Sequence, residues 1–283
     1  MFEPHQRYLL IDQTLWVLSS RTGISIYDFD FEAFLPCSHP WRRPESIQAI
    51  ARIGAFEDYP DEYDRLRADG VHLVHSPQQH LSCSRLPNWY PLLRDLTPRS
   101  RWYDSVPSVE DIEADFHWPV FVKGVRQTSG HQKSLSIIES PNAFGAAMRA
   151  YQQDPILRWQ GIVCREFVPL RPIGDAKHDR IPSSFEFRTF WWKGELVGCG
   201  RYWWEDRPYE MTATERKAAI AVAAEAANRV VVPFLVIDIA QTVDGRWIVI
   251  ECNDAQESGY AGVAPVGIWQ NIVSIERRER GNT

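Results

Sequence analysis

Short apolar runs separated by polar segments predict a mixture of strands and helices in the first hundred residues. The runs at 7–12 and 71–75 are short and rich in leucine and valine, which is typical of buried strands. The stretches at 46–52 and 59–68 have a helical spacing of apolar residues, and Gly70 separates the second from the strand that follows. We therefore expect a smaller α/β segment at the N-terminus.

A polar stretch rich in proline and serine follows at residues 96–108. Two prolines and four serine or threonine residues among these thirteen positions are typical of a linker or an exposed loop. We place a domain boundary there, which divides the chain into an N-terminal domain of residues 1–105 and a larger domain of residues 106–283.

The larger domain begins with strands and helices joined by polar connections. Strands are expected at 119–123 and 134–138, on either side of a polar, glycine-containing loop at 124–133. Ser140 followed by proline predicts the start of a helix that continues to residue 154. Another strand is expected at 162–168, so this region alternates strands and helices.

Two hairpins are expected in the second half of the chain. A two-residue turn at 193–194, between strands at 184–192 and 195–204, would place Arg188 opposite Cys199. An Asp-Gly pair separates two further apolar runs within residues 234–254 and is the strongest hairpin signal in the chain.

The second hairpin carries the most informative polar residues. A two-residue turn at 244–245 would place Asp238 directly opposite Glu251, with Asn253 on the same face. Opposed like charges are unfavourable on a sheet, so the two carboxylates need a shared proton, a basic neighbour or a hard cation. Two carboxylates and an amide oxygen are ligands of the kind that Mg²⁺ takes. A solvated face with basic neighbours is the alternative, and a three-residue turn would separate the pair.

The other face of the same hairpin is apolar and is expected to face the core. Ile248 and Ile250 belong to this face if the turn has two residues. The hairpin therefore predicts one core face and one face that carries carboxylates.

Two basic residues lie at positions suited to phosphate oxygens. Lys123 ends a strand and opens the glycine-containing loop, where backbone N–H groups and a cation could hold phosphate. Arg188 lies within a strand, where an unpaired guanidinium would be costly to bury. A phosphate would satisfy its planar fork, and an ion pair with Glu186 or another acid is the alternative.

Composition narrows the class of protein. The 283 residues are 44% apolar and 24% charged, which is enough to form a large core, and the net charge of −6 argues against a nucleic-acid partner. Five cysteines without a C-x-x-C pair argue against structural zinc and fit a reducing compartment. The N-terminus has no signal-peptide pattern, and no apolar run approaches the ~20 residues of a membrane span. We expect a cytoplasmic protein that does not bind membranes.

The order of these motifs resembles the ATP-grasp superfamily, and in particular members of uncharacterised substrate. The resemblance covers about residues 95–270 and rests on FVKG, CREFVPL, FEFRTF, an Ala-rich helix and a D…E-x-N hairpin. It implies an α+β class and the ATP-grasp fold, in which two α+β lobes hold a nucleotide between them. The smaller α/β segment would precede these lobes.

The resemblance also implies roles for individual residues. The nucleotide-binding set would comprise Lys123, Lys133, Glu166, Val168, Glu186 and Arg188. The Mg²⁺ ligands would be Asp238, Glu251 and Asn253. Lys123 and Arg188 would be catalytic because they would face the transferred phosphoryl group. Glu166 and Val168 would line the adenine hinge through backbone groups, Glu186 would contact the ribose, and the loop at 124–133 would be a lid.

Many family members have a second phosphate-binding lysine upstream of the FVKG-like strand. The corresponding region here offers only arginines, namely Arg94, Arg99 and Arg101, and we assign the role to none of them.

The activity implied by the resemblance is an ATP- and Mg²⁺-dependent ligation. A carboxylate would be activated as an acyl phosphate and attacked by an amine or a similar nucleophile, with release of ADP and phosphate. The substrates would be small molecules or peptides. A kinase-like phosphotransferase is an alternative, because residues that hold ATP do not specify what attacks it, and a non-catalytic nucleotide-binding module is another.

Overall fold

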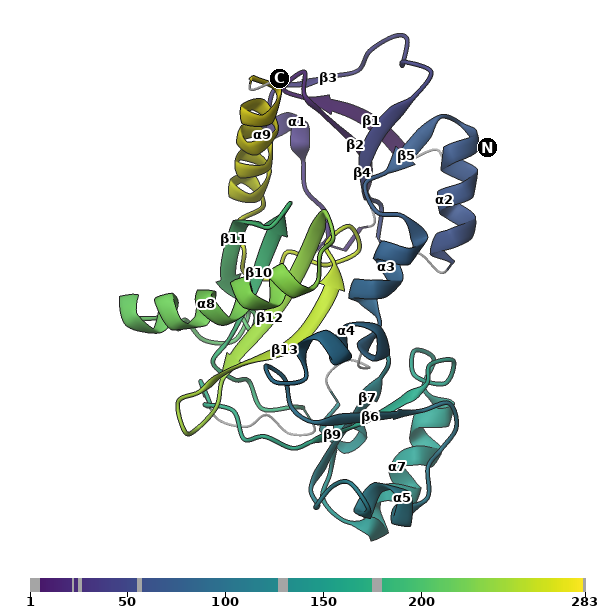
Figure 1. The fold of residues 1–283 in the computed structure, drawn as a ribbon, viewed down its shortest axis with the longest axis vertical. Helices are drawn as coiled ribbons and strands as arrows, with labels where there is room; N and C mark the ends of the chain where they lie inside the picture. Colours follow the sequence, from purple (N-terminus) through teal and green to yellow (C-terminus); the bar gives the residue numbers. More distant parts are fainter. Residues whose placement is uncertain are drawn as a thin grey trace.

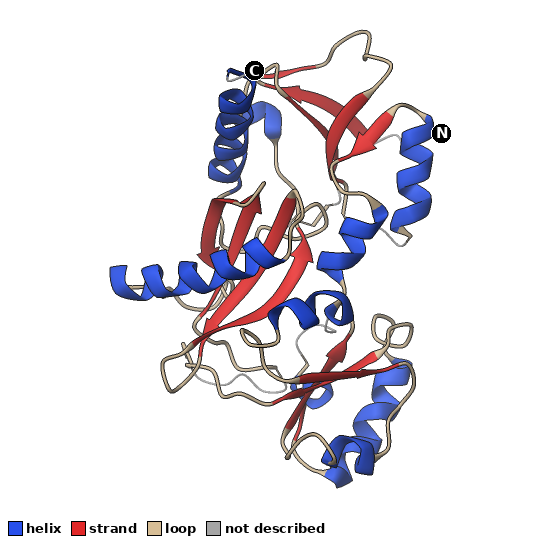
Figure 2. Ribbon diagram, in the orientation of Figure 1, coloured by secondary structure: helices blue, strands red, loops and turns tan. Residues whose placement is uncertain are grey.

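The chain folds around three sheets that follow one another along the molecule (Figure 1). A computed structural model describes residues 6–21, 23–24, 27–54, 58–126, 132–174 and 180–281. We call the sheets the N-terminal sheet (β1–β5), the small sheet (β6–β9) and the central sheet (β10–β13). Figure 2 shows helices packed beside each of the three sheets.

The N-terminal sheet has the strand order β3-β1-β2-β4-β5, with β2, β4 and β5 parallel. Its strands are β1 (Gln6–Ile11), β2 (Leu15–Ser20), β3 (Cys37–Ser38), β4 (Ile47–Arg52) and β5 (Val71–Leu73). The associated helices are α1 (Phe31–Phe34) and α2 (Tyr59–Ala68). The expected α/β segment is therefore present.

β4 corrects one sequence prediction. Residues 46–52 were expected to be helical, but they form a strand in which every residue except Gln48 is buried. A strand that is covered on both faces of a parallel sheet loses the alternation of apolar and polar residues, so its sequence does not distinguish it from a short helix.

The small sheet has the order β6-β9-β7-β8 and lies at the opposite end of the molecule from the N-terminal sheet (Figure 1). Its strands are β6 (Ser100–Tyr103), β7 (Val120–Gly124), β8 (Ile137–Ile138) and β9 (Ile162–Glu166). Its helices are α5 (Val109–Glu113), α6 (Lys133–Ser136) and α7 (Pro141–Gln153). The apolar face of α7 and the interior faces of the strands form a separate hydrophobic core.

The central sheet is antiparallel, with the order β11-β10-β12-β13. Its strands are β10 (Glu186–Trp192), β11 (Glu195–Arg201), β12 (Phe234–Gln241) and β13 (Trp247–Asp254). The helices around it are α3 (Pro77–Ser84), α4 (Leu86–Leu93), α8 (Ala213–Arg229) and α9 (Pro265–Gly281). The alanine-rich face of α8 packs on one side of this sheet, and α9 lies beside β11 (Figure 1).

One hydrophobic core joins the central and N-terminal sheets. Apolar side chains from β1, β2, β10, β12 and α9 belong to a single buried cluster. The stretch at 96–108, where we placed a boundary, contains β6, which pairs with β9 of the small sheet. The division into residues 1–105 and 106–283 stays a prediction.

The hairpin of β10 and β11 begins as predicted and then shifts by one residue. Trp192 lies opposite Glu195, but a bulge after Trp191 places Arg188 opposite Gly200 instead of Cys199. The expected pairing of Arg188 was therefore wrong, because a bulge adds a residue to one strand and moves every later pair.

The turn between β12 and β13 also differs from the prediction. Gln241 lies opposite Trp247, and the backbone N–H of Thr242 donates to the carbonyl oxygen of Arg246 at 2.8 Å. The turn therefore has three residues, 243–245, and Gly245 has φ of +88°. A positive φ at this position of a three-residue turn favours glycine.

A bulge in β13 restores the register that the longer turn removes. Ile250 is the extra residue, and beyond it Asp238 lies opposite Glu251 as predicted. Val249 joins the core, whereas Ile248 and Ile250 line a cavity. The prediction that both isoleucines face the core was therefore wrong, because a one-residue slip exchanges the two faces of a strand.

Candidate functional site

A cavity of about 270 Å³ is lined by residues of both the small and central sheets. Its charged residues are Lys123, Arg165, Glu166, Glu186, Asp238 and Glu251. Apolar side chains, among them Phe121, Ile137, Phe167, Val168, Ile248 and Ile250, line much of the rest. A concave, mostly apolar site with a few convergent charges is typical of small-molecule and cofactor binding.

Arg188 and Asp238 form a buried ion pair on neighbouring strands. Arg188 Nε and Nη2 lie 2.8 and 2.7 Å from the two carboxylate oxygens of Asp238, and Nη1 donates to the carbonyl oxygen of Gly259 at 2.8 Å. Burial opposes the charge of Arg188, but the Asp238 carboxylate holds the pKa of the guanidinium above its usual range. The partner of Arg188 is thus an acid other than Glu186.

Lys123 and Glu251 form a second buried pair across the two sheets. Lys123 Nζ contacts Glu251 Oε1 directly, and the lysine is 5% exposed. Burial acts to raise the pKa of Glu251, but Lys123 and a hydrogen bond from Asn253 together hold it below its usual value. The face that carries the carboxylates therefore has basic neighbours, although it is buried.

The three oxygen-bearing side chains of the hairpin lie together. Asp238 is directly opposite Glu251, and Asn253 contacts Glu251 through its side chain. Two carboxylates and an amide oxygen on adjacent strands fit a hard cation such as Mg²⁺. Lys123 and Arg188 neutralise the carboxylates here, so a cation would compete with these basic groups for the same oxygen atoms.

Glu186 lines the cavity and is almost fully buried. Its Oε2 accepts hydrogen bonds from Ser184 Oγ at 3.1 Å and from Trp203 Nε1 at 3.0 Å. Burial raises the pKa of Glu186 to about 8. An acid of this kind can change its protonation state near neutral pH, and such groups are enriched at functional sites.

The remaining predicted residues differ in position. Glu166 and Val168 line the cavity, and the backbone N–H of Glu166 donates to the carbonyl oxygen of Arg99 at 2.8 Å. Lys133 Nζ lies 3.8 Å from Glu139, and within the described parts of the chain Lys133 does not line the cavity. Residues 127–131 of the predicted lid lie outside the described residues.

Sequence analysis missed Arg165, which lines the cavity from β9. It is 4% exposed, and burial lowers the pKa of its guanidinium to about 10. A charged residue inside an otherwise apolar strand was the available signal, and the same signal drew attention to Arg188.

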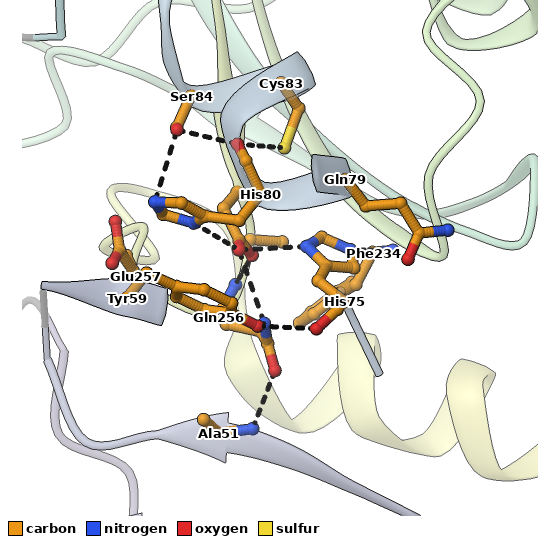
Figure 3. A network of polar contacts seen from close by, with 12 residues as sticks. Ala51, Tyr59, His75, Gln79, His80, Cys83, Ser84, Phe234, Gln256 and Glu257 are labelled. Atoms are coloured by element: carbon orange, nitrogen blue, oxygen red, sulfur yellow. Dashed lines mark hydrogen bonds and ion pairs between the residues drawn. The ribbon is translucent and has the colours of Figure 1, made fainter. Parts of the chain in front are cut away.

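A second buried polar cluster surrounds Asp254, at the end of β13 (Figure 3). One carboxylate oxygen of Asp254 lies 2.9 Å from His75 Nδ1 and 3.0 Å from His80 Nδ1. The other accepts the backbone N–H of Gln256 at 2.8 Å. The Gln256 side chain also accepts the backbone N–H of Ala51, so the Asp254 cluster joins β13 to the N-terminal sheet.

The groups of the Asp254 cluster are committed to one another. The backbone N–H of Phe234 donates to His75 Nε2 at 3.0 Å, which leaves the ring proton on Nδ1, facing Asp254. His75, Cys83 and Asp254 have ligand atoms within 4.8 Å of one another and could hold a metal ion. Burial holds the pKa of the Cys83 thiol well above its usual range, which disfavours the thiolate that a metal requires.

None of the helices within the described ranges has both the length and the apolar character that a membrane span requires.

Comparisons with known proteins identify the fold. A family model described as an ATP-grasp domain, the third family of its clade, matches residues 86–272, and no curated protein matches the chain. The D-alanine–D-alanine ligase from Bacillus anthracis, complexed with ATP, is 12% identical at a TM-score of 0.58, and the match covers 83% of this chain and 80% of that one.

Two longer proteins also match. The N5-carboxyaminoimidazole ribonucleotide synthetase from Thermotoga maritima is 13% identical at a TM-score of 0.51, with coverage of 74% and 51%. The L-amino acid ligase from Bacillus licheniformis is 16% identical at a TM-score of 0.47, with coverage of 76% and 49%. The present chain spans about half the length of each of these two.

Proposed function

This chain belongs to the ATP-grasp superfamily, and we propose that it is an ATP- and Mg²⁺-dependent ligase. In the proposed reaction, a carboxylate attacks the γ-phosphate of ATP to form an acyl phosphate and ADP. An amine or a similar nucleophile then displaces the phosphate. The substrates would be a small-molecule or peptide carboxylate and an amine, and residues 106–283 would form the catalytic domain.

The single observation that carries this proposal is the cavity between the two sheets. Its charged residues bring Lys123 together with Asp238 and Glu251, and its apolar residues include the segment at 166–170 that follows β9. An apolar surface suits a purine, and the charged residues suit phosphate oxygens and a divalent cation. A nucleotide needs both kinds of surface in one site.

Phosphoryl transfer requires charge neutralisation more than covalent chemistry. A bound Mg²⁺ would supply part of that neutralisation at the phosphates. Lys123 and Arg188 would contribute the rest, by releasing Glu251 and Asp238 and turning to phosphate oxygens. The two ion pairs thus keep the basic side chains in place before the nucleotide arrives.

The remaining sites are also proposals. The backbone of Glu166 and Val168 would contact the adenine, and Glu186 would contact the ribose. Lys133 is the last member of the nucleotide-binding set, and its partly exposed ammonium would have to leave Glu139 to reach a phosphate.

The test is to incubate the protein with ATP, Mg²⁺ and panels of carboxylic acids and amines, and to follow phosphate release. We expect ADP and phosphate only when an acid and an amine are both present. Lys123→Met should abolish the reaction, whereas Lys193→Met should not, because Lys193 pairs with Glu276 and Glu279 away from the cavity. Formation of AMP and pyrophosphate, or of a phosphorylated product that never couples, would contradict the proposal.

A further inference from the structure

Arg165 is held rigidly at the wall of the cavity. Its Nε donates to Ser100 Oγ at 3.0 Å, and its Nη1 donates to the carbonyl oxygen of Ile250 at 2.8 Å. The guanidinium carbon lies 5.8 Å from the centre of the Trp89 ring. These contacts come from three different segments and fix the orientation of the guanidinium plane.

The third nitrogen of the same guanidinium has no such contact. Arg165 Nη2 is buried and, within the part of the chain that the structure describes, has no hydrogen-bond partner. A buried donor without a partner is costly, so native proteins rarely retain one without a reason. A cation with one free donor at the wall of a cavity is arranged to receive an anion.

The neighbours of Arg165 indicate which anion fits. β9 continues directly from Arg165 into the segment at 166–168, which lines the same cavity together with Lys123. A ligand that fills this cavity would therefore meet two basic side chains and an apolar wall. A phosphate bonded to an apolar ring system satisfies all of these groups at once.

We propose that Arg165 binds a phosphate group of the nucleotide through Nη2. The inference rests on the proposed function, since it assumes that ATP occupies the cavity, and it adds a contact that neither the sequence motifs nor the comparisons assign. Arg165 also fixes the bulge at Ile250, one residue before Glu251, so the phosphate contact and the geometry of the predicted cation site are mechanically linked.

The experiment compares binding of ATP and of adenosine, in the presence of Mg²⁺, to the wild-type protein and to Arg165→Gln by isothermal titration calorimetry. Loss of a charged hydrogen bond should weaken ATP binding by about tenfold or more. Adenosine lacks the phosphates, so its affinity should stay close to that of the wild type.

Thr97→Val is the matched control. Thr97 Oγ1 donates to the carbonyl oxygen of Val249 at 2.9 Å, so it supports β13 one residue away from Ile250, and it does not line the cavity. Its loss should leave the ratio of the ATP and adenosine affinities unchanged. Arg165→Lys keeps the positive charge and should reduce this ratio less than Arg165→Gln does.

The ratio of the two affinities can be taken from whichever Arg165 variant stays folded. Equal weakening of ATP and adenosine would overturn the inference, because it would indicate a structural role alone, and so would an unchanged affinity for ATP. If the wild-type protein itself binds no ATP, the proposed function fails first. The two failures are therefore distinguishable.

Discussion

Two buried polar clusters lie along β13, and they differ in how their charges are balanced. In the Asp254 cluster, a single carboxylate is surrounded by two imidazoles and a backbone N–H, all from this chain. In the cavity, acids and bases are matched two by two, and Arg165 retains a free donor. The first cluster is complete without a ligand, whereas the second has binding capacity left over.

The difference separates residues that hold the fold from residues that are available for chemistry. Asp254 follows the predicted ligand Asn253 directly in the sequence, yet it joins the N-terminal sheet to the central sheet. Burial and charge alone would not distinguish it from Glu251. What distinguishes the two acids is the surroundings, because only Glu251 lines a cavity.

Substitution within the cavity cluster should have the largest effect on activity. Glu251→Gln removes a proposed cation ligand and the charge partner of Lys123, so we expect ATP-dependent phosphate release to fall by about a hundredfold or more. Glu257→Gln is the control, because Glu257 is similarly buried in an ion pair with Arg126 at 3.0 Å but does not line the cavity. Full activity in Glu251→Gln would erase the distinction between the clusters.

Substitution within the Asp254 cluster should instead act on stability. Asp254→Asn removes the charge that the two histidines and the Gln256 N–H surround, so we expect the free energy of unfolding to fall by about 3 kcal/mol. Urea denaturation would measure the change. Asp95→Asn, at the exposed pair with Arg229, should cause none that can be measured. Equal effects of the two substitutions would mean that the Asp254 cluster does not hold the sheets together.

The pH dependence of stability offers a third comparison. The pKa of Glu186 is raised from 4.5 to about 8, so the folded protein binds a proton that the unfolded chain has lost. The free energy of unfolding should therefore fall as the pH rises from about 4.5 to about 8. Glu186→Gln should remove this fall and gain about 2 kcal/mol relative to the wild type at pH 8.5.

Denaturation curves of both proteins at pH 5 and pH 8.5 would measure the difference. Glu195→Gln, at an exposed pair with Arg278, should keep the wild-type profile. A Glu186→Gln profile parallel to that of the wild type would show that Glu186 is ionised throughout this range.

The smallest effect is expected at Cys83, which tests whether the Asp254 cluster is a metal site. Cys83→Ala should lower the free energy of unfolding by about 1 kcal/mol through the loss of a buried sulfur atom. Neither Zn²⁺ nor a chelator should change the melting temperature of the wild type. A stoichiometric metal that the substitution removes would contradict this view of the cluster.

The site was more predictable than the path of the strands that form it. The opposition of Asp238 and Glu251 was predicted from a two-residue turn, whereas the structure reaches it through a three-residue turn and a compensating bulge. A bulge leaves no periodic signal in the sequence, because one added residue among apolar neighbours resembles an ordinary strand. The pairing is thus correct, although the reasoning behind its register was not.

Long-range partners were the least predictable features. Arg188 was expected to need a partner, but the sequence could not identify Asp238, which lies fifty residues further along the chain. His75 and His80 had no spacing that indicated a shared function, because Asp254 brings them together only in the folded chain. Local motifs predict elements and candidate residues, whereas tertiary packing decides which of them meet.

The bulge at Ile250 has a consequence for how this site can diversify. On one side of it lie the carboxylates, and on the other lie Ile248 and the turn. Changes in turn length, or in the apolar residues before the bulge, can reshape the wall of the cavity while Asp238 and Glu251 keep their register. Ligand preference and cation binding can therefore evolve, or be engineered, as separate traits within a single hairpin.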